Sequence, residues 1–420
     1  MTAPGRHALI TGIGMINAVG HDATRSWQAI LDGKSAIGPI RRFDPSGLQV
    51  SLAAEVDGFT PPKEISRRLI AKSDRFAHFA LAATAQALAD ARLDVTAEDP
   101  FRIGISFGNN SGGWDICERG FVEYYQQGPP MINPWQATAW FPTAPQGFVS
   151  IQYNIRGWSK SFACDRASGG SAAYFGLRAL RWDHNDVMLV GGAEAPVTRL
   201  GVGAHVSTGD LSRRPEPDRA YLPYSPDGTG LVLGEGSAVL VAEEATRAAA
   251  RGVPAYGELL AVEQRTGRPD DGAVLEAALR AALAQAGRDA GQVGLILGEG
   301  CGTPAADRLE ADVLGRVLPG VPVAVPKAAI GHTYGAAAAT DIAYALLAMR
   351  DGVIPPTAGT APDDGGRCAP LLAAALDRAL DTAVVVSRSR EGTNVVAVVG
   401  RGQDRSWRQA GGGEHGGNTR

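Results

Sequence analysis

The chain has 420 residues, of which 45% are hydrophobic and 20% are charged, so it is long enough to bury a large core. Its formal net charge of -4 gives no basic field, which excludes nucleic acid and an anionic membrane surface as expected partners. No stretch reaches the roughly 20 apolar residues of a membrane span, and no signal-peptide segment follows Met1, so we expect a cytoplasmic protein. The widely spaced cysteines and the unpaired histidines predict neither disulfides nor a metal site.

Short apolar segments alternate with longer helical patterns, which predicts an α/β protein with largely buried strands. In the first series, the expected strands are residues 8–14, 102–108 and 186–192, and the expected helices are residues 66–91 and 168–182. In the second series, the expected strands are residues 258–265, 293–300, 382–389 and 393–402, and the expected helices are residues 273–287 and 336–352. Two similar series predict a duplicated fold with halves at residues 1–250 and 251–402, followed by a polar, glycine-rich disordered tail at residues 403–420.

One segment near the start is superficially similar to a dinucleotide-binding loop. In TGIGMINAVG, the third glycine of the GxGxxG pattern falls on Asn17, and no acidic residue follows a second strand at the required spacing. The later segment GEGCGTP lacks the GK[ST] of a phosphate-binding loop. We therefore expect no nucleotide cofactor.

Four motifs in a fixed order carry a resemblance to a known family. They are TGIGMINAVGHDATRSWQAILDGKSAIGPIRRFD, LPYSPDGTGLVLGEGSAVLVAEE, GTPAADRLE and PKAAIGHTYGAAAATDIAYALLAMRDGVIPPT. Together they resemble the beta-ketoacyl synthase family from residue 7 to about residue 400. The resemblance implies a thiolase fold with a duplicated five-layered αβαβα arrangement, an obligate dimer, and cofactor-free acyl chemistry on acyl carrier protein thioesters.

The resemblance also shows where catalytic residues are missing. By the family's spacing from the GGAE motif, Arg166 occupies the position of the nucleophilic cysteine, and Glu299 that of the first catalytic histidine. Arginine is permanently protonated and offers no lone pair to a thioester, which excludes an acyl-enzyme at this position. The family's lysine and second histidine remain as Lys327 and His332, and we expect them to hold the loop and core by hydrogen bonds. We expect an ion pair between Arg166 and Glu299, with Asp165 as a competing partner for the arginine.

Other positions near the missing nucleophile also depart from the family. The gating loop reads SRSREGTN and contains Arg388 and Arg390, of which Arg390 replaces the gate phenylalanine, so it no longer suits an acyl-chain gate. Cys164 precedes the expected helix and is interpreted as a structural buried thiol. Ser168 is interpreted as a residue of the first helical turn.

A family member without its nucleophile predicts a chain-length factor of a type II polyketide or polyene synthase. Such a subunit pairs with a ketosynthase alpha subunit and shapes the tunnel for the growing chain on acyl carrier protein. By alignment, the tunnel and dimer-interface residues are Ser111, Gly112, Trp114, Asp115, Cys117, Glu118, Trp135, Gln136 and Trp140. Ordinary core or interface packing is the alternative for the tryptophans. Retention of Lys327 and His332 favours a polyene system.

Two enzymatic functions are alternatives. A malonyl-carrier-protein decarboxylase would supply starter units, but Glu299 places a negative charge where that reaction needs a hydrogen-bond donor. An acyltransferase of the same fold would use a displaced nucleophile, for which Cys164 and Cys301 are the candidates.

Overall fold

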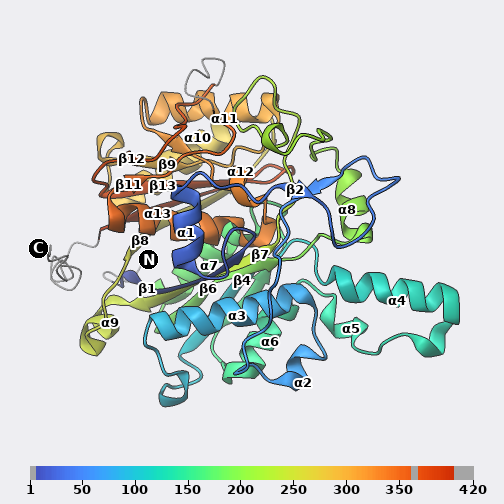
Figure 1. Ribbon diagram of the computed structural model, residues 1–420. Helices are drawn as coiled ribbons and strands as arrows, with labels where there is room; N and C mark the ends of the chain where they lie inside the picture. The colour runs from blue at the N-terminus through green and yellow to red at the C-terminus, as the bar shows by residue number, and fades with distance from the viewer. Residues whose placement is uncertain (1–5, 361–367, 402–420) are drawn as a thin grey trace, which may run out of the picture.

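Two sets of five strands form the central sheet of the computed structural model, which describes residues 6–360 and 368–401 (Figure 1). The first set consists of β1 (Ala8–Asn17), β4 (Ile103–Gly108), β5 (Ser159–Phe162), β6 (Val187–Glu194) and β7 (Gly236–Glu244). The second set consists of β8 (Gly257–Thr266), β9 (Leu295–Leu297), β10 (Val323–Ala324), β13 (Thr382–Arg388) and β14 (Thr393–Gly400). The sets join where β1 pairs with β8, so that the strand order is β5-β4-β6-β7-β1-β8-β14-β13-β9-β10.

The two sets repeat one pattern of strand pairing. In the first set, β4 pairs in parallel with β5 and β6, while β7 is antiparallel to β6 and β1. In the second set, β9 pairs in parallel with β10 and β13, while β14 is antiparallel to β13 and β8. The repeated order confirms the predicted duplicated α/β fold.

Helices cover both faces of each set of strands. Those of the first part of the chain are α1 (Ala23–Leu31), α2 (Arg67–Ile70), α3 (Arg75–Asp90), α4 (Trp114–Gln127), α5 (Gln136–Ala139), α6 (Ala144–Tyr153), α7 (Ser168–Arg181) and α8 (Arg199–Val206). Those of the second part are α9 (Ala245–Arg251), α10 (Gly272–Ala286), α11 (Pro304–Val317), α12 (Lys327–Ile330) and α13 (Ala337–Asp351). Two short strand pairs of the described chain lie outside the central sheet: β2 (Gly38–Pro39) with β3 (Leu52–Ala53), and β11 (Val353–Ile354) with β12 (Leu376–Asp377).

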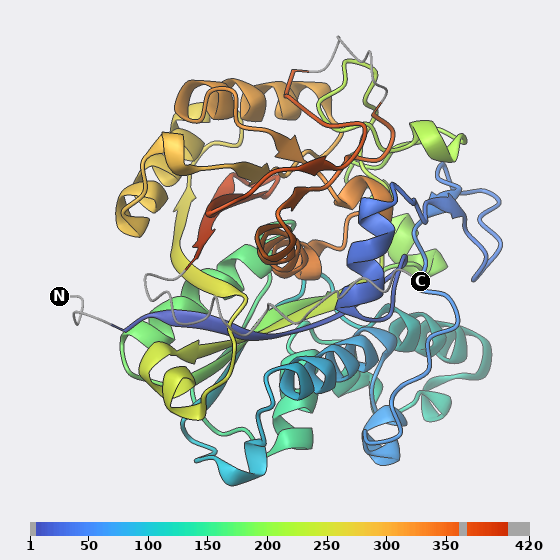
Figure 2. The ribbon, with the colours of Figure 1, turned by 60° about the vertical axis from the view of Figure 1, so that its left-hand side comes forward.

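The helices and strands stack as five layers, which Figure 2 shows nearly edge-on. Helices α3 and α6 cover the outer face of the first set of strands, and α10 and α11 cover that of the second set. Helices α7 and α13 lie between the two sets and contact strands of both. This order of helix, sheet, helix, sheet and helix is the arrangement that the family resemblance implies.

Small residues allow β1 and α3 to approach closely. A Cβ atom on Gly14 would lie 1.8 Å from the carbonyl oxygen of Ala83, and one on Gly12 would lie 2.2 Å from that of Ala87. Protein cores are close-packed and leave no room for such an atom. The glycines of the TGIG segment therefore serve the contact between strand and helix.

One predicted helix is wrong in its extent. The pattern at residues 66–91 is divided into α2 and α3, because Asp74 has an extended backbone with φ -105° and ψ 166°. The carboxylate of Asp74 accepts a hydrogen bond of 2.7 Å from the backbone N–H of Ile116 in α4. A contact between distant segments thus interrupts a continuous helical pattern.

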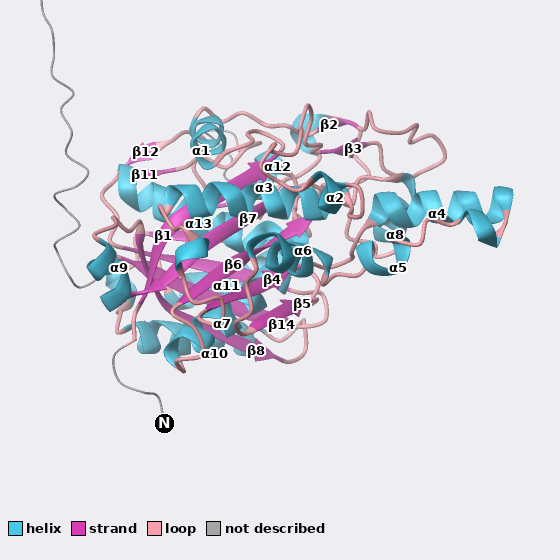
Figure 3. Ribbon diagram, turned by 90° about the horizontal axis from the view of Figure 1, so that it is seen from below, coloured by secondary structure: helices cyan, strands magenta, loops and turns pink. Residues whose placement is uncertain are grey.

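Helix α4 and the segment through α5 project away from the layers, as Figure 3 shows from below. We call residues 111–141 the arm. Its exposed large apolar side chains are Phe121, Val122, Tyr124, Tyr125, Met131, Trp135, Trp140 and Phe141. Many exposed apolar side chains on one projecting segment are typical of surfaces that bind another protein.

Two statements about organisation follow from the described residues. Among them, no helix is both long and apolar enough to cross a membrane. Residue 250 lies within α9, just before the chain enters the second set of strands, and we keep the division into residues 1–250 and 251–402 as a proposal. The disorder predicted for residues 403–420 concerns positions outside the described residues.

We predict that Gly14→Ala lowers the free energy of unfolding by about 1–3 kcal/mol, because the new methyl group overlaps the backbone of α3. Gly147→Ala is the matched control, since Gly147 lies within α6 and nothing lies within 4 Å of an added Cβ. The control should gain about 0.5–1 kcal/mol from its better helix propensity. Urea unfolding of both variants measures the effect, and equal stabilities would contradict the close contact.

Candidate functional site

Arg166 lies just before α7, and its side chain is only 7% exposed. Its Nε lies 3.4 Å from Oε1 of Glu299, and its Nη1 lies 3.3 Å from Oδ2 of Asp210. The Oδ2 atom of Asp165 is more distant from Nε, at 3.8 Å. The expected ion pair between Arg166 and Glu299 is therefore present, and Asp210 is a further partner that sequence reasoning missed.

Both members of this pair stay charged at neutral pH. Burial by itself lowers the pKa of Arg166, but the surrounding negative groups, including Glu299 and Asp210, raise it above its ordinary value. Burial by itself raises the pKa of Glu299, but His332, Lys327 and Arg166 outweigh it and hold this pKa at about 2. The start of α7 thus holds a guanidinium cation paired with a carboxylate that is ionised at neutral pH.

His332 is fully buried, and both of its ring nitrogens are engaged. Nδ1 accepts a hydrogen bond of 3.0 Å from the backbone N–H of Tyr334, which leaves the ring proton on Nε2. Nε2 lies 2.9 Å from Oε1 of Glu299 and donates to it. An imidazole N–H committed to a carboxylate is not free to polarise a thioester carbonyl.

Lys327 is equally committed. Its Nζ donates a hydrogen bond of 2.9 Å to the carbonyl of Gly298 and forms a buried ion pair with Asp341. Burial opposes the charge of Lys327, but Asp341 and Glu299 raise its pKa above the ordinary value. These contacts agree with the expectation that Lys327 and His332 hold loop and core by hydrogen bonds.

The loop that the sequence predicts to replace the family's gate is fastened to Arg166. The carbonyl of Arg388 accepts a hydrogen bond of 3.2 Å from Nε of Arg166. The backbone N–H of Arg390 donates to Asp165 at 2.9 Å, and its Nε lies 3.1 Å from Asp210. The charged side chains of Asp165, Arg166, Asp210 and Arg390 therefore hold this loop against the start of α7.

The two candidate replacement nucleophiles are poorly suited to that role. Cys164 is half-buried against the core, and its backbone N–H donates to Oγ of Ser168 at 2.9 Å. Ser168 begins α7, as expected, and donates its own proton to the carbonyl of Asp165 at 2.6 Å. Cys301 is buried with its thiol 3.4 Å from Asp307, and burial together with this carboxylate raises its pKa to about 12. A thiol with so high a pKa is not a nucleophile at neutral pH.

The sequence carries a signal for one of the two acidic partners that sequence reasoning missed, but not for the other. Asp341 is the only acidic residue before the last position of the otherwise apolar helix α13, and an isolated charge in an apolar pattern indicates a buried pair. Asp210 lies in a loop with no periodic pattern, so nothing in the sequence relates it to Arg166.

The predicted tunnel and interface residues gather on the arm, but they do not share one role. The carboxylate of Asp115 lies 2.9 Å from Nη2 of Arg42, and that of Glu118 accepts the backbone N–H of Leu200 at 2.8 Å. These contacts fasten the base of α4 to the body. Half-buried or exposed positions of the arm are Ser111, Trp114, Cys117, Trp135, Gln136 and Trp140, whereas Gly112 is buried in the turn before α4.

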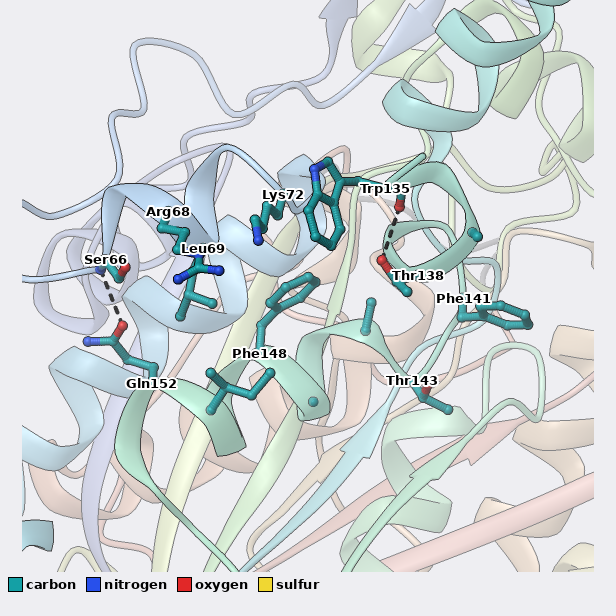
Figure 4. Close-up of a pocket in the computed structure, with 14 residues that line it drawn as sticks. Ser66, Arg68, Leu69, Lys72, Trp135, Thr138, Phe141, Thr143, Phe148 and Gln152 are labelled. Carbon is teal, nitrogen blue, oxygen red and sulfur yellow. Dashed lines mark hydrogen bonds between the residues drawn. The ribbon is translucent and has the colours of Figure 1, made fainter. Parts of the chain in front are cut away.

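A pocket of about 900 Å³ lies beside the arm between α2, α5 and α6 (Figure 4). Trp135 stands at its edge, with Nζ of Lys72 3.8 Å from the centre of its ring. Phe141 and Phe148 contribute apolar wall, and Ser66 donates its backbone N–H to Gln152 at 3.2 Å across the far end. The pocket is thus separate from the cluster around Arg166.

We predict that Arg166→Met lowers the free energy of unfolding by about 3–5 kcal/mol, because it leaves the buried carboxylate of Glu299 without the guanidinium. The double variant Arg166→Met with Glu299→Gln should lose less than the sum of the two single variants, by roughly 0.5–3 kcal/mol. Urea unfolding of the wild type and the three variants measures this coupling. Strict additivity would show that the two side chains do not interact.

Asp307 predicts a dependence of stability on pH. Burial raises its pKa to about 7, well above the value of roughly 3.9 in an unfolded chain. Between these two pH values the folded state keeps a proton that the unfolded chain has released. The free energy of unfolding therefore falls as the pH rises from about 4 to about 7. In Asp307→Asn, which has no carboxyl group to titrate, the free energy of unfolding should fall less between pH 5 and 8 than in the wild type, by on the order of 2 kcal/mol. Unfolding curves across that range test it, and identical pH slopes would refute it.

Comparison with known proteins places this geometry in a family. Residues 6–248 match the beta-ketoacyl synthase N-terminal domain, and residues 261–361 match the beta-ketoacyl synthase C-terminal domain. The tetracenomycin polyketide synthase ketoacyl synthase beta subunit of Streptomyces glaucescens is 37% identical, over 96% of this chain and 100% of its own. The actinorhodin polyketide beta-ketoacyl synthase 2 of Streptomyces coelicolor is 35% identical, over 94% of this chain and 98% of its own.

A solved structure agrees with these matches. The ishigamide ketosynthase/chain length factor superposes with a TM-score of 0.85 and 25% identity, over 94% of this chain and 99% of that chain. Two relatives are more than 30% identical across nearly their full lengths, and the two domain matches cover most of the chain. The chain therefore belongs to the beta-ketoacyl synthase family.

Proposed function

We propose that this protein is the chain-length factor, or ketosynthase beta subunit, of a type II polyketide or polyene synthase. It pairs with a catalytically active ketosynthase alpha subunit and shapes the tunnel that holds the growing chain on acyl carrier protein. The observation that carries the proposal is Arg166, a buried arginine at the predicted nucleophile position, in a chain that is 37% identical to a ketoacyl synthase beta subunit. We further propose that it acts in the cytoplasm.

The charge cluster supports a subunit without condensing activity. A condensing site needs a thiolate at the start of α7 and donors for the developing enolate. Here a guanidinium occupies the first position, and Glu299 occupies the second and takes the N–H of His332. Closure of the loop that contains Arg388 and Arg390 by the same cluster leaves no use for this site in acyl transfer.

The arm supports a role that is exerted on a partner. Its exposed aromatic residues would be costly to leave in water, and aromatic side chains are enriched where proteins bind each other. Strand β5 lies at the free edge of the first set of strands, next to α6, and offers unpaired backbone groups to a second subunit. We infer that partner contact at this side brings the arm next to the tunnel of the ketosynthase.

The alternative of a malonyl decarboxylase is less well supported. That reaction develops negative charge on the thioester oxygen, which needs nearby donors. The His332 N–H is already donated to Glu299, whose pKa of about 2 keeps it negative. Repulsion between this carboxylate and an enolate disfavours decarboxylation.

We predict that chain elongation requires both subunits. The measurement is intact mass spectrometry of acyl carrier protein after incubation with malonyl and starter carrier proteins, with this protein alone and then co-expressed with an active ketosynthase. Elongated products should form only with the pair, because this chain has no nucleophile at Arg166.

Two controls separate the possible functions. Replacing the partner's nucleophilic cysteine should abolish elongation by the pair, which would assign the chemistry to the partner. Elongation or loss of carbon dioxide from malonyl carrier protein by this chain alone would overturn the proposal. In that case Cys164→Ala and His332→Ala would identify the group responsible.

A further inference from the structure

The hydroxyl group of Ser111 connects a buried carboxylate with the indole of Trp114. Oγ of Ser111 donates a hydrogen bond of 2.7 Å to Oε1 of Glu194. Nε1–H of Trp114 donates a hydrogen bond of 2.7 Å to Oγ of Ser111. Because an indole N–H can only donate, Oγ of Ser111 accepts from Trp114 through a lone pair, and its own proton points to Glu194.

Glu194 is a rigid anchor for this relay. It ends β6, is fully buried, and its Oε2 accepts backbone N–H groups of Asn110 at 2.8 Å and Gly335 at 3.2 Å. Gly335 lies in the same loop as His332. One carboxylate therefore connects the base of the arm with the loop that contains His332. The relay therefore starts from a fixed point in the core.

The indole of Trp114 is also confined by aromatic neighbours. Its ring centre lies 6.1 Å from that of His205, which lies 5.0 Å from that of Tyr334, and Tyr334 lies 4.9 Å from His332. A Cβ on Gly201 would lie 3.1 Å from Cγ of Trp114, so the glycine makes room for the ring against α8. Edge-to-face packing together with one directed hydrogen bond selects a single orientation of the ring.

We propose that Ser111 is a positioning residue that fixes the indole of Trp114 and thereby sets the length of the acyl chain that the heterodimer builds. The inference rests on the proposed function, in which the arm borders the partner's tunnel. A polyketide or polyene chain grows until its end meets a wall, so a ring held in one orientation gives one limit. A ring that turns freely gives a broader and longer set of products.

The test compares Ser111→Ala with Ser111→Thr in the co-expressed heterodimer. The alanine variant removes the relay, whereas the threonine variant retains a hydroxyl and should restore the wild-type products. Intact mass spectrometry of acyl carrier protein reads the product lengths. We expect the ratio of longer to wild-type-length products to rise about fivefold in the alanine variant. A change of this size corresponds to the loss of one hydrogen bond of typical net strength.

A second measurement reads the hydrogen bond without catalysis. The chain has 7 tryptophans, so ¹⁵N-labelled indole groups give few resonances, and Trp114→Phe identifies the one of Trp114. Ser111→Ala should shift this resonance and speed its exchange with solvent, while Ser111→Thr should keep it near the wild-type position. Trp114→Phe, which lacks the donor, should change product length in the same direction and add little to Ser111→Ala.

The outcomes distinguish this inference from the proposed function. If the wild-type pair elongates chains but Ser111→Ala leaves the product lengths or the indole resonance unchanged, the positioning role is wrong and the proposed function stands. If elongation does not depend on this chain at all, the proposed function fails and the inference with it. Loss of heterodimer in both Ser111 variants would show a merely structural role and would also overturn the inference.

Discussion

A buried guanidinium must be surrounded by negative charge, and Arg166 imposes this requirement at the start of α7. Its guanidinium contacts the carboxylates of Glu299, in the loop after β9, and Asp210, in the loop after α8. It also donates a hydrogen bond to the carbonyl of Arg388 at the end of β13. Segments that lie far apart in the sequence are held together by this one cation. A single buried charge at the start of α7 thus gives structural cohesion to this part of the chain.

His332 and Lys327, which the sequence predicts to be retained catalytic residues, have partners that engage their hydrogen-bonding groups. His332 keeps its place, but its two nitrogens serve Glu299 and the backbone of Tyr334. Lys327 keeps its charge, but it neutralises Asp341 inside the layer of central helices. Retention of a catalytic residue type is therefore compatible with loss of the reaction, because reactivity depends on a free donor or lone pair.

The loop that contains His332 is also connected to the exposed arm. Through Glu194, the loop of His332 shares an anchor with the base of the arm, and the arm carries the exposed aromatic side chains. Rigidity at the inactive site thereby supports a defined shape at the partner surface. A subunit that acts by shape needs such a support, since a wall that moves does not limit the length of a chain.

The sequence by itself determined the fold, because buried strands and amphipathic helices leave periodic patterns. The ordered motifs also led to the prediction that Arg166, Glu299, Lys327 and His332 stand at the family's catalytic positions. Only the tertiary structure decided which partners these residues have. Asp210 and the relay through Ser111 arise from contacts between loops distant in sequence, and such contacts leave no periodic signal. The division of the helix at Asp74 has the same cause, because its carboxylate binds the backbone of a helix some 40 residues later.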